Sequence, residues 1–548
     1  MFCTECGAPL DASDRFCTAC GQACVSEGAC ETGGWSFFIE ETGAKAPMGA
    51  PHATIIFTHL GRLREDLGSG FPGFEALLRR YVSERSPEGG RRVLLDAGRN
   101  FLGECSGAEW QGHLRILRAA VDWMEDRALC AESVLIVGDE RVIPMPCLEN
   151  PVGADSDVDS DYPYSALSEA DPWEELHPER VAVGRIPVGT ASGAGPGTKY
   201  LENVLRAQGG IAAAEPFGLG AAVWAGASRE TLATFSRAPV VLSPPSCVRV
   251  VEERLGSHQG LLYFNLHGTN EPDEPGWFGE SHQREFPKVV VPRHFKELAD
   301  FNVVGVEACY GGRFTGYAED GSCLLSALGH RTLGFLGASR IAFGPPDPPR
   351  GLADIVVGDF LRHVSGGASL GRAHMEARRA LEDAAEEDAH ARLSILEFNL
   401  FGDPDLCPFP GSGVSLGKAP GSDDGQGGVS GMRGRGTPAS RLRGLIRAET
   451  QSARKKIGAA IRKVDLGALI GAEIRRSLDR CREASGDYLA QRCPSVLGGE
   501  VREACYGSGG RMLLLQHFFK KARGGPRAGI SLKQDLASGQ ILQAYHIK

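Results

Sequence analysis

The fold is decided by residues 261–312, LLYFNLHGTNEPDEPGWFGESHQREFPKVVVPRHFKELADFNVVGVEACYGG. Two apolar runs within this stretch, Leu261–Leu266 and Val303–Ala308, have the length and composition of buried parallel strands. The first run leads into His267-Gly268, and the second leads into Cys309-Tyr310-Gly311-Gly312. Because the carboxyl ends of neighbouring strands in a parallel sheet open into one crevice, the pattern predicts that the histidine and the cysteine meet there.

These two residue types suit nucleophilic catalysis. A thiol becomes a strong nucleophile only as the thiolate, and a nearby imidazole can take its proton near neutral pH. His267 and Cys309 therefore fit a base and a nucleophile, and the backbone N–H groups of Gly268 and Cys309 fit an oxyanion hole. A lone cysteine after a strand is also a common buried apolar residue, and a lone histidine is a common structural one, so each residue alone leaves a structural interpretation open.

Four further segments occur in a fixed order around this pair. They are VLIVGDERVIP at 134–144, DYPY at 161–164, VAVGRIPV at 181–188 and FNLFGDPDL at 398–406. With the His-Gly and Ala-Cys elements, they resemble the gingipain family of the caspase clan of cysteine peptidases over roughly residues 50–410. The resemblance implies a caspase-like fold, with His267 as the general base and Cys309 as the nucleophile.

The surrounding chain alternates between strand-like and helix-like segments. Expected strands include Ala53–Phe57, Ala221–Ala225 and Val248–Val251. Alternation of this kind predicts a doubly wound α/β fold, with mostly parallel sheets flanked by helices. The resemblance to gingipains implies that this fold is of the caspase-hemoglobinase type. We expect two halves, a non-catalytic subdomain at 51–190 and a catalytic subdomain at 191–410.

The first 24 residues contain two Cys-x-x-Cys pairs, each followed by glycine. Cys3 and Cys6 form one pair, and Cys17 and Cys20 form the other. Four thiolates presented on two tight turns suit tetrahedral Zn²⁺, although a redox-active Cys-x-x-Cys is the alternative. The pattern predicts a structural zinc ribbon at 1–24, followed by a linker at 25–50.

Residues 149–175 are acidic, with Asp at every second position from 155 to 161. A calcium-binding loop of the EF-hand type would need Gly at 160 and Glu at 166, where this chain has Ser160 and Ala166. We therefore expect a solvated acidic loop, and no metal is assigned to it.

The resemblance also implies where a substrate side chain would bind. Ser339 follows the strand after Cys309 and would form one wall of the pocket. Gingipains and several bacterial relatives prefer a basic residue before the scissile bond, because a guanidinium matches a carboxylate. Glu230 is the candidate for that carboxylate, with Asp273 and Glu274 as rivals.

Composition suggests a cytoplasmic protein that does not enter the membrane. No apolar run approaches the roughly 18–20 residues needed to span a bilayer, and the start of the chain lacks the pattern of a secretory signal. Here the chain departs from the gingipains, which are secreted. Residues 1–410 carry 35 Lys and Arg against 58 Asp and Glu, whereas residues 411–548 carry 24 against 11. The basic tail should bind either the acidic body or an acidic partner.

The end of the chain divides into two parts. Residues 411–439 include 10 Gly among 29 residues and no aromatic residue, which predicts a flexible linker. Residues 440–548 begin with a basic amphipathic pattern and are expected to form a basic helical region. Arginines in and beside the linker are candidate processing sites: Arg433, Arg435, Arg441 and Arg443.

The function expected from these features is a cytoplasmic caspase-like cysteine endopeptidase with a His–Cys dyad. We expect protein substrates, a preference for Arg, no catalytic cofactor and regulation by proteolytic processing, with an upstream protease or a regulatory protein as a partner. Stress, cell-death or antiviral defence pathways follow from the resemblance. Two alternatives stay open: a catalytically silent zinc-ribbon scaffold, and a nucleic-acid-binding regulator, which the net charge of −10 disfavours.

Overall fold

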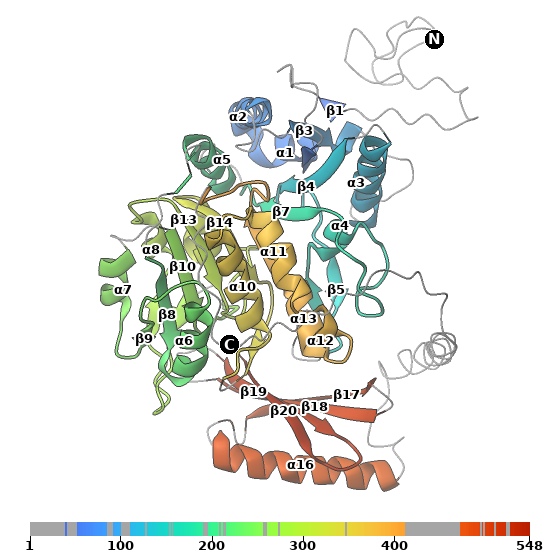
Figure 1. The fold of residues 1–548 in the computed structure, drawn as a ribbon, viewed down its shortest axis with the longest axis vertical. Helices are drawn as coiled ribbons and strands as arrows, with labels where there is room; N and C mark the ends of the chain where they lie inside the picture. The colour runs from blue at the N-terminus through green and yellow to red at the C-terminus, as the bar shows by residue number, and fades with distance from the viewer. Residues whose placement is uncertain are drawn as a thin grey trace, which may run out of the picture. The chain divides into compact units, whose positions relative to one another are not determined.

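The computed structural model describes residues 39–40, 52–410 and 472–547, apart from gaps at 85–90, 100–109, 127–128, 153–154, 156, 190–194, 208–209, 212–214, 256–259, 272–273, 346–347, 494–495, 497–498, 509–510 and 522–526. Residues 39–548 form one compact unit, distinct from residues 1–38. Helices and strands of the described residues are shown in Figure 1. The expected zinc ribbon, the linker expected at 411–439 and the four candidate processing arginines lie outside the described residues. Of the linker expected at 25–50, only Ile39–Glu40 are described, and they form a strand of the sheet, which corrects the expectation of a linker at this point.

One eleven-stranded sheet runs through both predicted α/β halves, in the order β1-β3-β2-β4-β7-β16-β14-β13-β10-β8-β9. The first half supplies β1 (Ile39–Glu40), β2 (His52–Thr58), β3 (Arg91–Asp96), β4 (Cys130–Val137) and β7 (Ala182–Ile186). The second half supplies β8 (Phe217–Ala221), β9 (Val241–Ser243), β10 (Gly260–Asn265), β13 (Asn302–Val306), β14 (Thr332–Ala338) and β16 (Phe398–Gly402). The expected mostly parallel α/β sheet is confirmed.

The two halves join at β16. This strand pairs parallel with β7 and antiparallel with β14, so the strands of the first half run opposite to those of the second. Within the second half, β10 pairs parallel with both β13 and β8. The carboxyl ends of β10 and β13 therefore lie side by side, as predicted from residues 261–312.

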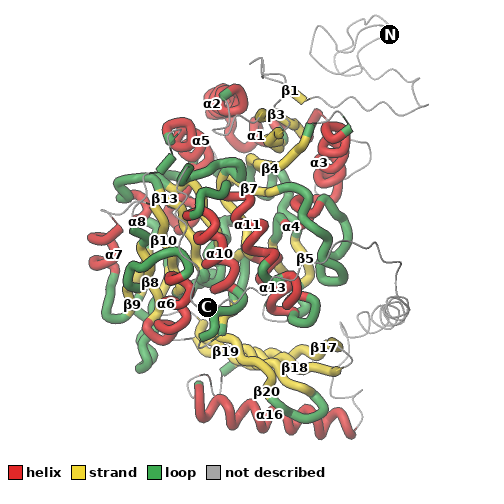
Figure 2. The backbone as a smooth tube through the Cα atoms, viewed as in Figure 1, coloured by secondary structure: helices red, strands yellow, loops and turns green. Residues whose placement is uncertain are grey.

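Helices cover this sheet, and Figure 2 shows them around the strands. In the first half they are α1 (Leu60–Leu67), α2 (Phe71–Ser83), α3 (Trp110–Glu125) and the short α4 (Tyr162–Ala166). In the second half they are α5 (Pro196–Arg206), α6 (Ala225–Ala233), α7 (Val248–Leu255), α8 (Arg293–Lys296), α9 (Cys323–Leu328), α10 (Ala353–Ser365), α11 (Leu370–Arg379), α12 (Glu382–Ala385) and α13 (Ala389–Glu397). Their apolar faces are buried, as in α10, where Val356, Val357 and Phe360 are inaccessible to solvent.

Two strand predictions in the second half were wrong. Val248–Val251 belongs to helix α7, in which Val251 and Leu255 are buried one helical turn apart. Ala221–Ala225 contains only the end of strand β8, because helix α6 begins at Ala225. Short apolar runs do not distinguish a strand from one face of a helix, and the packing partner decided both cases.

The prediction of a helical carboxy-terminal region was incomplete. The described part of this region contains helix α16 (Ala472–Arg492) and four antiparallel strands, β17 (Glu500–Ser508), β18 (Arg511–Lys521), β19 (Arg527–Asp535) and β20 (Ile541–Ile547). We call these four strands the carboxy-terminal sheet. Residues of α16, such as Leu489, pack against Phe518, Ile530 and Leu532 of this sheet, so apolar burial across two layers stabilises it. The amphipathic pattern that suggested a longer helix lies mainly before residue 472, outside the described residues.

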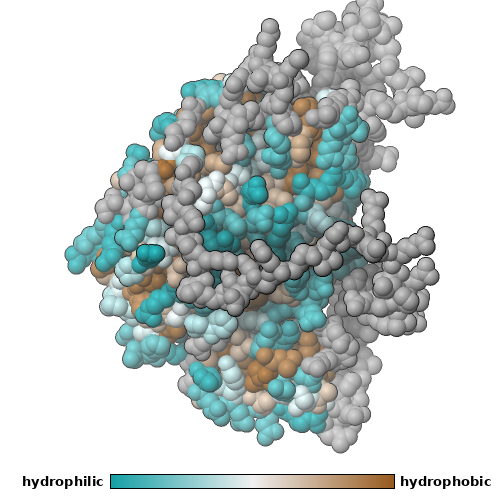
Figure 3. Space-filling view, in the orientation of Figure 1, coloured by the Kyte–Doolittle hydropathy of each residue, from teal (hydrophilic) through white to brown (hydrophobic). Residues whose placement is uncertain are grey.

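The surface of the described residues is mixed in character. Figure 3 shows a predominantly hydrophilic face interrupted by hydrophobic patches. Among the described residues, no helix combines the length and apolar content needed to cross a bilayer.

Candidate active site

His267 lies two residues after β10 and is held in place by its own backbone. Its N–H and C=O both bond to Phe278 of β11 (Trp277–Phe278), at N–O distances of 2.9 Å. The imidazole is 1% exposed and contacts two aromatic rings, with centroid distances of 4.3 Å to Trp224 and 5.4 Å to Phe286. The ring is therefore packed on several sides and has little freedom to turn.

Glu280 supports the histidine, and the sequence pattern had not indicated it. Its Oε2 lies 2.8 Å from His267 Nε2. Burial acts to raise the pKa of Glu280, but the hydrogen bond and charge of His267, with help from Arg284, hold that pKa below its usual value. An ionised carboxylate can only accept, so His267 Nε2 carries the hydrogen of this bond, and in the neutral imidazole Nδ1 then keeps its lone pair.

His267 Nδ1 is left available for proton transfer. This atom is buried, and within the described residues no hydrogen bond to it is found. An imidazole with one nitrogen held by a carboxylate and the other open is arranged as a general base. Glu280 was missed because it follows His267 by 13 positions, and only the backbone pairing of His267 with Phe278 returns the chain to the imidazole.

Cys309 meets the His267 loop at Gly268. A Cβ placed on Gly268 would lie 1.7 Å from the Cys309 carbonyl oxygen and 3.1 Å from its nitrogen, so no side chain fits at this position. The predicted meeting of the two strand ends therefore occurs, with the two loops in backbone contact. Within the described residues, no backbone carbonyl is found to accept from the N–H groups of Gly268 and Cys309.

The residue after the cysteine has a constrained backbone. Tyr310 has a φ of 56°, a left-handed conformation that is uncommon for a bulky residue. Three hydrogen bonds hold the turn: Tyr310 N donates to Arg340 O (2.8 Å), Tyr310 Oη donates to Asp155 Oδ1 (2.9 Å), and Ile341 N donates to Asp155 Oδ2 (3.1 Å). Backbone strain of this kind costs about 1–3 kcal/mol and persists only where neighbouring contacts maintain it.

The Cys309 thiol is buried and donates to a backbone carbonyl. Its Sγ lies 3.8 Å from Ala342 O, to which it donates, and the residue is 3% exposed. Burial raises the pKa of Cys309 well above its usual value, and the Glu397 and Asp155 carboxyl groups act in the same direction. Glu397 is itself fully buried, and neither of its carboxyl oxygens has a hydrogen-bond partner among the described residues.

The candidate pocket residues have different surroundings. Glu230 Oε2 accepts a hydrogen bond from Arg350 N at 3.0 Å, so it already supports the loop after β15 (Phe343–Gly344). Ser339 Oγ donates to Asp159 O at 2.7 Å. Glu274 is partly exposed in the loop after His267, and Asp273 lies outside the described residues.

A small cavity lies between the loop after His267 and the loop after Cys309. Glu271 and Arg313 both line it, and Arg313 lies over the rings of Tyr310 and Tyr317, 5.9 and 5.7 Å from their centroids. The cavity thus presents both signs of charge beside the candidate nucleophile.

The acidic stretch is not a solvated loop, which corrects the expectation from sequence. Asp157 and Asp159 of β6 (Asp157–Asp159) pair with the Arg340 guanidinium, and β6 pairs with β5 (Cys147–Glu149). Asp155 holds the Tyr310 turn. Asp155, Asp157 and Asp159 therefore bind Tyr310, Arg340 and Ile341, because the guanidinium, the hydroxyl and the N–H group of these residues require acceptors there.

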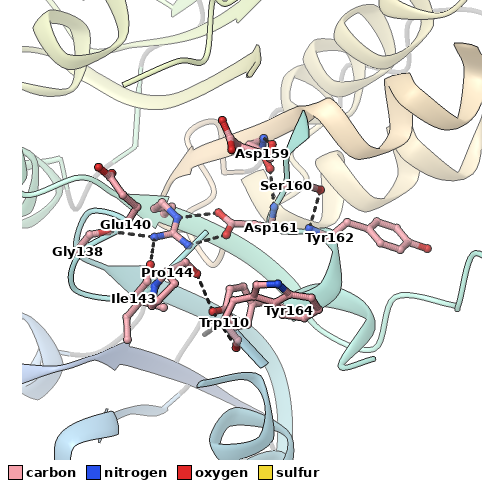
Figure 4. A network of polar contacts seen from close by, with 12 residues as sticks. Trp110, Gly138, Glu140, Ile143, Pro144, Asp159, Ser160, Asp161, Tyr162 and Tyr164 are labelled. Atoms are coloured by element: carbon pink, nitrogen blue, oxygen red, sulfur yellow. Dashed lines mark hydrogen bonds and ion pairs between the residues drawn. The ribbon is translucent and has the colours of Figure 1, made fainter. Parts of the chain in front are cut away.

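The four ordered segments meet in a buried group that we call the Arg185 cluster, consisting of Arg185, Asp161, Asn399 and the chain around Gly138 and Ile143. Figure 4 shows Asp161, Gly138 and Ile143 in this network. Arg185 Nη2 and Nε bond to Asp161 Oδ1 and Oδ2 at 2.6 and 2.9 Å. Arg185 Nη1 donates to Ile143 O and Gly138 O, and Asp161 N donates to Asn399 Oδ1 at 2.9 Å. The segments that carried the family resemblance thus join the two halves of the sheet.

Among the described residues, His52, Cys130 and Glu132 form the one group of three potential metal ligands within 4.8 Å of one another. All three are exposed, and His52 already pairs with Glu132 at 2.6 Å. An exposed ion pair accounts for this group.

The zinc-ribbon domain family matches residues 2–23, which confirms the expected ribbon. No curated protein matches the chain. Among solved structures, the Arg-specific cysteine proteinase gingipain R is similar at 12% identity and a TM-score of 0.44, covering 65% of this chain and 78% of that one. A structure described only as a protease is similar at 10% identity and the same TM-score, covering 66% of this chain and 79% of the other.

Proposed function

We propose that this chain is a cysteine endopeptidase with His267 as the general base and Cys309 as the nucleophile. The observation that supports this most strongly is the open Nδ1 of a buried imidazole whose Nε2 is held by Glu280, on a loop in backbone contact with Cys309. Other buried histidines among the described residues, such as His390 and His517, also have one ring nitrogen without a hydrogen bond, so the contact of its loop with Cys309 is what distinguishes His267.

In the proposed reaction, His267 Nδ1 takes the thiol proton and Cys309 Sγ attacks the scissile carbonyl, forming a carbon–sulfur bond. The N–H groups of Gly268 and Cys309 donate to the resulting oxyanion. The carbon–nitrogen bond then breaks, His267 returns its proton to the leaving amine, and water hydrolyses the thioester. The thiol must first exchange its Ala342 partner for His267.

Specificity and regulation belong to the same proposal. We propose cleavage after Arg, with Glu271 as a further candidate carboxylate besides Glu230, Asp273 and Glu274, because Glu271 lines the cavity between the two reactive loops. Processing at Arg433, Arg435, Arg441 or Arg443 in a cytoplasmic zymogen completes the proposal. If a peptide library instead shows cleavage mainly after acidic residues, Arg313 would be the residue of the cavity that binds the substrate side chain.

We also propose that Cys3, Cys6, Cys17 and Cys20 bind one structural Zn²⁺. The donor set of four thiols in two Cys-x-x-Cys pairs suits tetrahedral coordination. Metal analysis of the purified protein should give about one zinc per chain, lost in the Cys3→Ser, Cys6→Ser variant while cleavage of a small peptide continues.

Single-residue variants assayed on a peptide library test the catalytic assignment. Cys309→Ala and His267→Ala should each abolish cleavage while the thermal unfolding midpoint stays near that of the wild type, because residues that act as one unit lose nearly all activity together. Cys407→Ala, which removes another buried thiol, is the matched control and should remain active. Full turnover by either site variant, with contaminants excluded, would refute the proposal.

A catalytically silent scaffold is the second candidate function. It is favoured by the buried thiol, whose pKa is raised and which bonds to Ala342 rather than to His267. Absence of any Cys309-dependent cleavage or alkylation in the wild type would support it.

A further inference from the structure

The carboxy-terminal sheet reaches the His267 ring through a short series of contacts. Strand β20 pairs antiparallel with β15, with Ile547 opposite Phe343 and His546 opposite Gly344. Trp224 Nε1 donates a hydrogen bond to His546 Nδ1 at 3.0 Å. The Trp224 ring in turn packs on His267, with 4.3 Å between ring centroids and 53° between planes.

Trp224 requires an acceptor at the position where His546 supplies one. The residue ends the turn Ala222–Trp224 after β8, and its side chain is 1% exposed. A buried indole N–H is costly without a hydrogen-bond partner, so the orientation of the ring depends on that partner. His546, from the other end of the chain, therefore helps to determine where the indole lies.

The indole is one of three side chains that contact the His267 ring. Glu280 holds one nitrogen of His267, Phe286 meets the ring edge-on, and Trp224 covers it at a tilt.

Several further contacts hold the carboxy-terminal sheet in this position. Asp388, which caps α13, accepts a hydrogen bond from Tyr545 and lies 3.7 Å from Lys533 Nζ. His390 Nε2 lies 3.0 Å from Ser531 Oγ. Because these groups are buried and paired, the sheet is fixed to the α/β body by specific polar contacts as well as by the β15–β20 ladder.

We propose that His546 is a positioning residue for the peptidase proposed above, acting through Trp224 on the catalytic His267. The carboxy-terminal sheet then completes the active site. It is distinct from an inhibitory segment, whose removal would raise activity. This inference rests on the proposed function and adds to it the requirement for residues 541–547.

Four full-length variants and one control test the proposal. His546→Leu removes the acceptor, Trp224→Phe removes the donor and keeps an aromatic ring, and the third variant combines both changes. His546→Gln keeps an acceptor. The control is Gln543→Leu, an exposed position three residues earlier on the same strand. Each protein is compared in kcat, KM, thermal unfolding and the pH dependence of Cys309 alkylation by iodoacetamide.

We expect kcat to fall about tenfold in His546→Leu and Trp224→Phe, with KM nearly unchanged, because a small displacement of a catalytic group lowers the rate of the chemical step. The double variant should be no slower than the slower single variant, since both changes remove one interaction. His546→Gln should recover most of kcat, and Gln543→Leu should match the wild type. The alkylation profile should shift in the slow variants and in no other.

Other outcomes would overturn the inference in identifiable ways. A higher kcat in His546→Leu would show that strand β20 inhibits the enzyme. Losses of kcat that add up in the double variant would show that His546 and Trp224 act independently. If kcat falls across the variants only as far as the thermal unfolding midpoint falls, His546 contributes to stability and does not position His267. If the wild type itself shows no Cys309-dependent cleavage, the proposed function fails; if it cleaves and His546→Leu cleaves equally well, only this inference fails.

Discussion

The Arg185 cluster and the His267 site are both buried charged groups, and they differ in how fully their atoms are bonded. Arg185 bonds to both oxygens of Asp161 and to the carbonyls of Ile143 and Gly138. His267 is equally buried but has one nitrogen bonded and the other open. A fully bonded network stabilises a single arrangement, whereas an imidazole nitrogen without a hydrogen bond is available for proton transfer. Burial and charge alone therefore do not identify a reactive site.

The largest expected effect is on the Arg185 cluster. Asp161→Ala should lower the free energy of unfolding by about 3–5 kcal/mol, because it leaves the buried guanidinium without its counter-charge. Denaturant titration followed by circular dichroism measures the change. The double variant Asp161→Leu, Arg185→Met should be less destabilised than Asp161→Ala, since it leaves no unpaired charge. Equal destabilisation of both would show that packing, and not charge, holds the cluster.

The contrasting change is in the His267 site. Glu280→Gln should reduce kcat/KM about 100-fold and alter the free energy of unfolding by less than about 1 kcal/mol, because Gln keeps the shape but no longer fixes the Nε2–H tautomer. Peptide cleavage and denaturant titration on the same preparation separate the two effects. A loss of stability as large as that of Asp161→Ala would place Glu280 with the structural groups.

Acid should weaken the attachment of the carboxy-terminal sheet. Burial acts to raise the pKa of Asp388, but His390, Lys533 and Tyr545 together hold that pKa well below its usual value. A lowered pKa gives stability that is present above the usual carboxyl pKa of about 3.9 and is lost as pH falls below it. The protection of the amide hydrogens at residues 541–547, measured relative to their intrinsic exchange rate at each pH, should therefore fall below about pH 4. Asp388→Asn should exchange faster at neutral pH and respond less to acid.

The smallest expected effect concerns Glu397. Burial, with the Asp155 carboxylate next, raises the pKa of Glu397 well above its usual value. The folded chain thus keeps this proton above the unfolded pKa of about 4.3, and its stability falls as pH rises from there towards the folded pKa. Glu397→Gln should be more stable than the wild type at pH 8 by about 1 kcal/mol, with no gain at pH 4. Thermal unfolding at the two pH values is the measurement, and an equal gain at both would rule out the linkage.

Much of the α/β body could be predicted from local pattern. The runs Leu261–Leu266 and Val303–Ala308 became β10 and β13, and their neighbouring carboxyl ends brought His267 and Cys309 together. This worked because strand length and parallel pairing leave only one edge of the sheet for both residues. The carboxy-terminal sheet was not predicted, because the basic helical pattern lies mainly before residue 472 and does not continue over the strands, such as Arg511–Lys521.

Within the site, local sequence identified the reactive residue types and tertiary structure identified the groups that control them. The Gly after His267 was correctly expected to permit close approach, because its requirement is local. Glu280, Trp224 and His546 carried no motif, since each reaches His267 through pairing between segments distant in the chain. Sequence by itself determined most strands of the sheet, the sheet edge that carries His267 and Cys309, and the zinc-ribbon pattern. Only tertiary structure decided which atoms are bonded and which stay open, because hydrogen bonding and burial depend on segments that sequence proximity does not bring together.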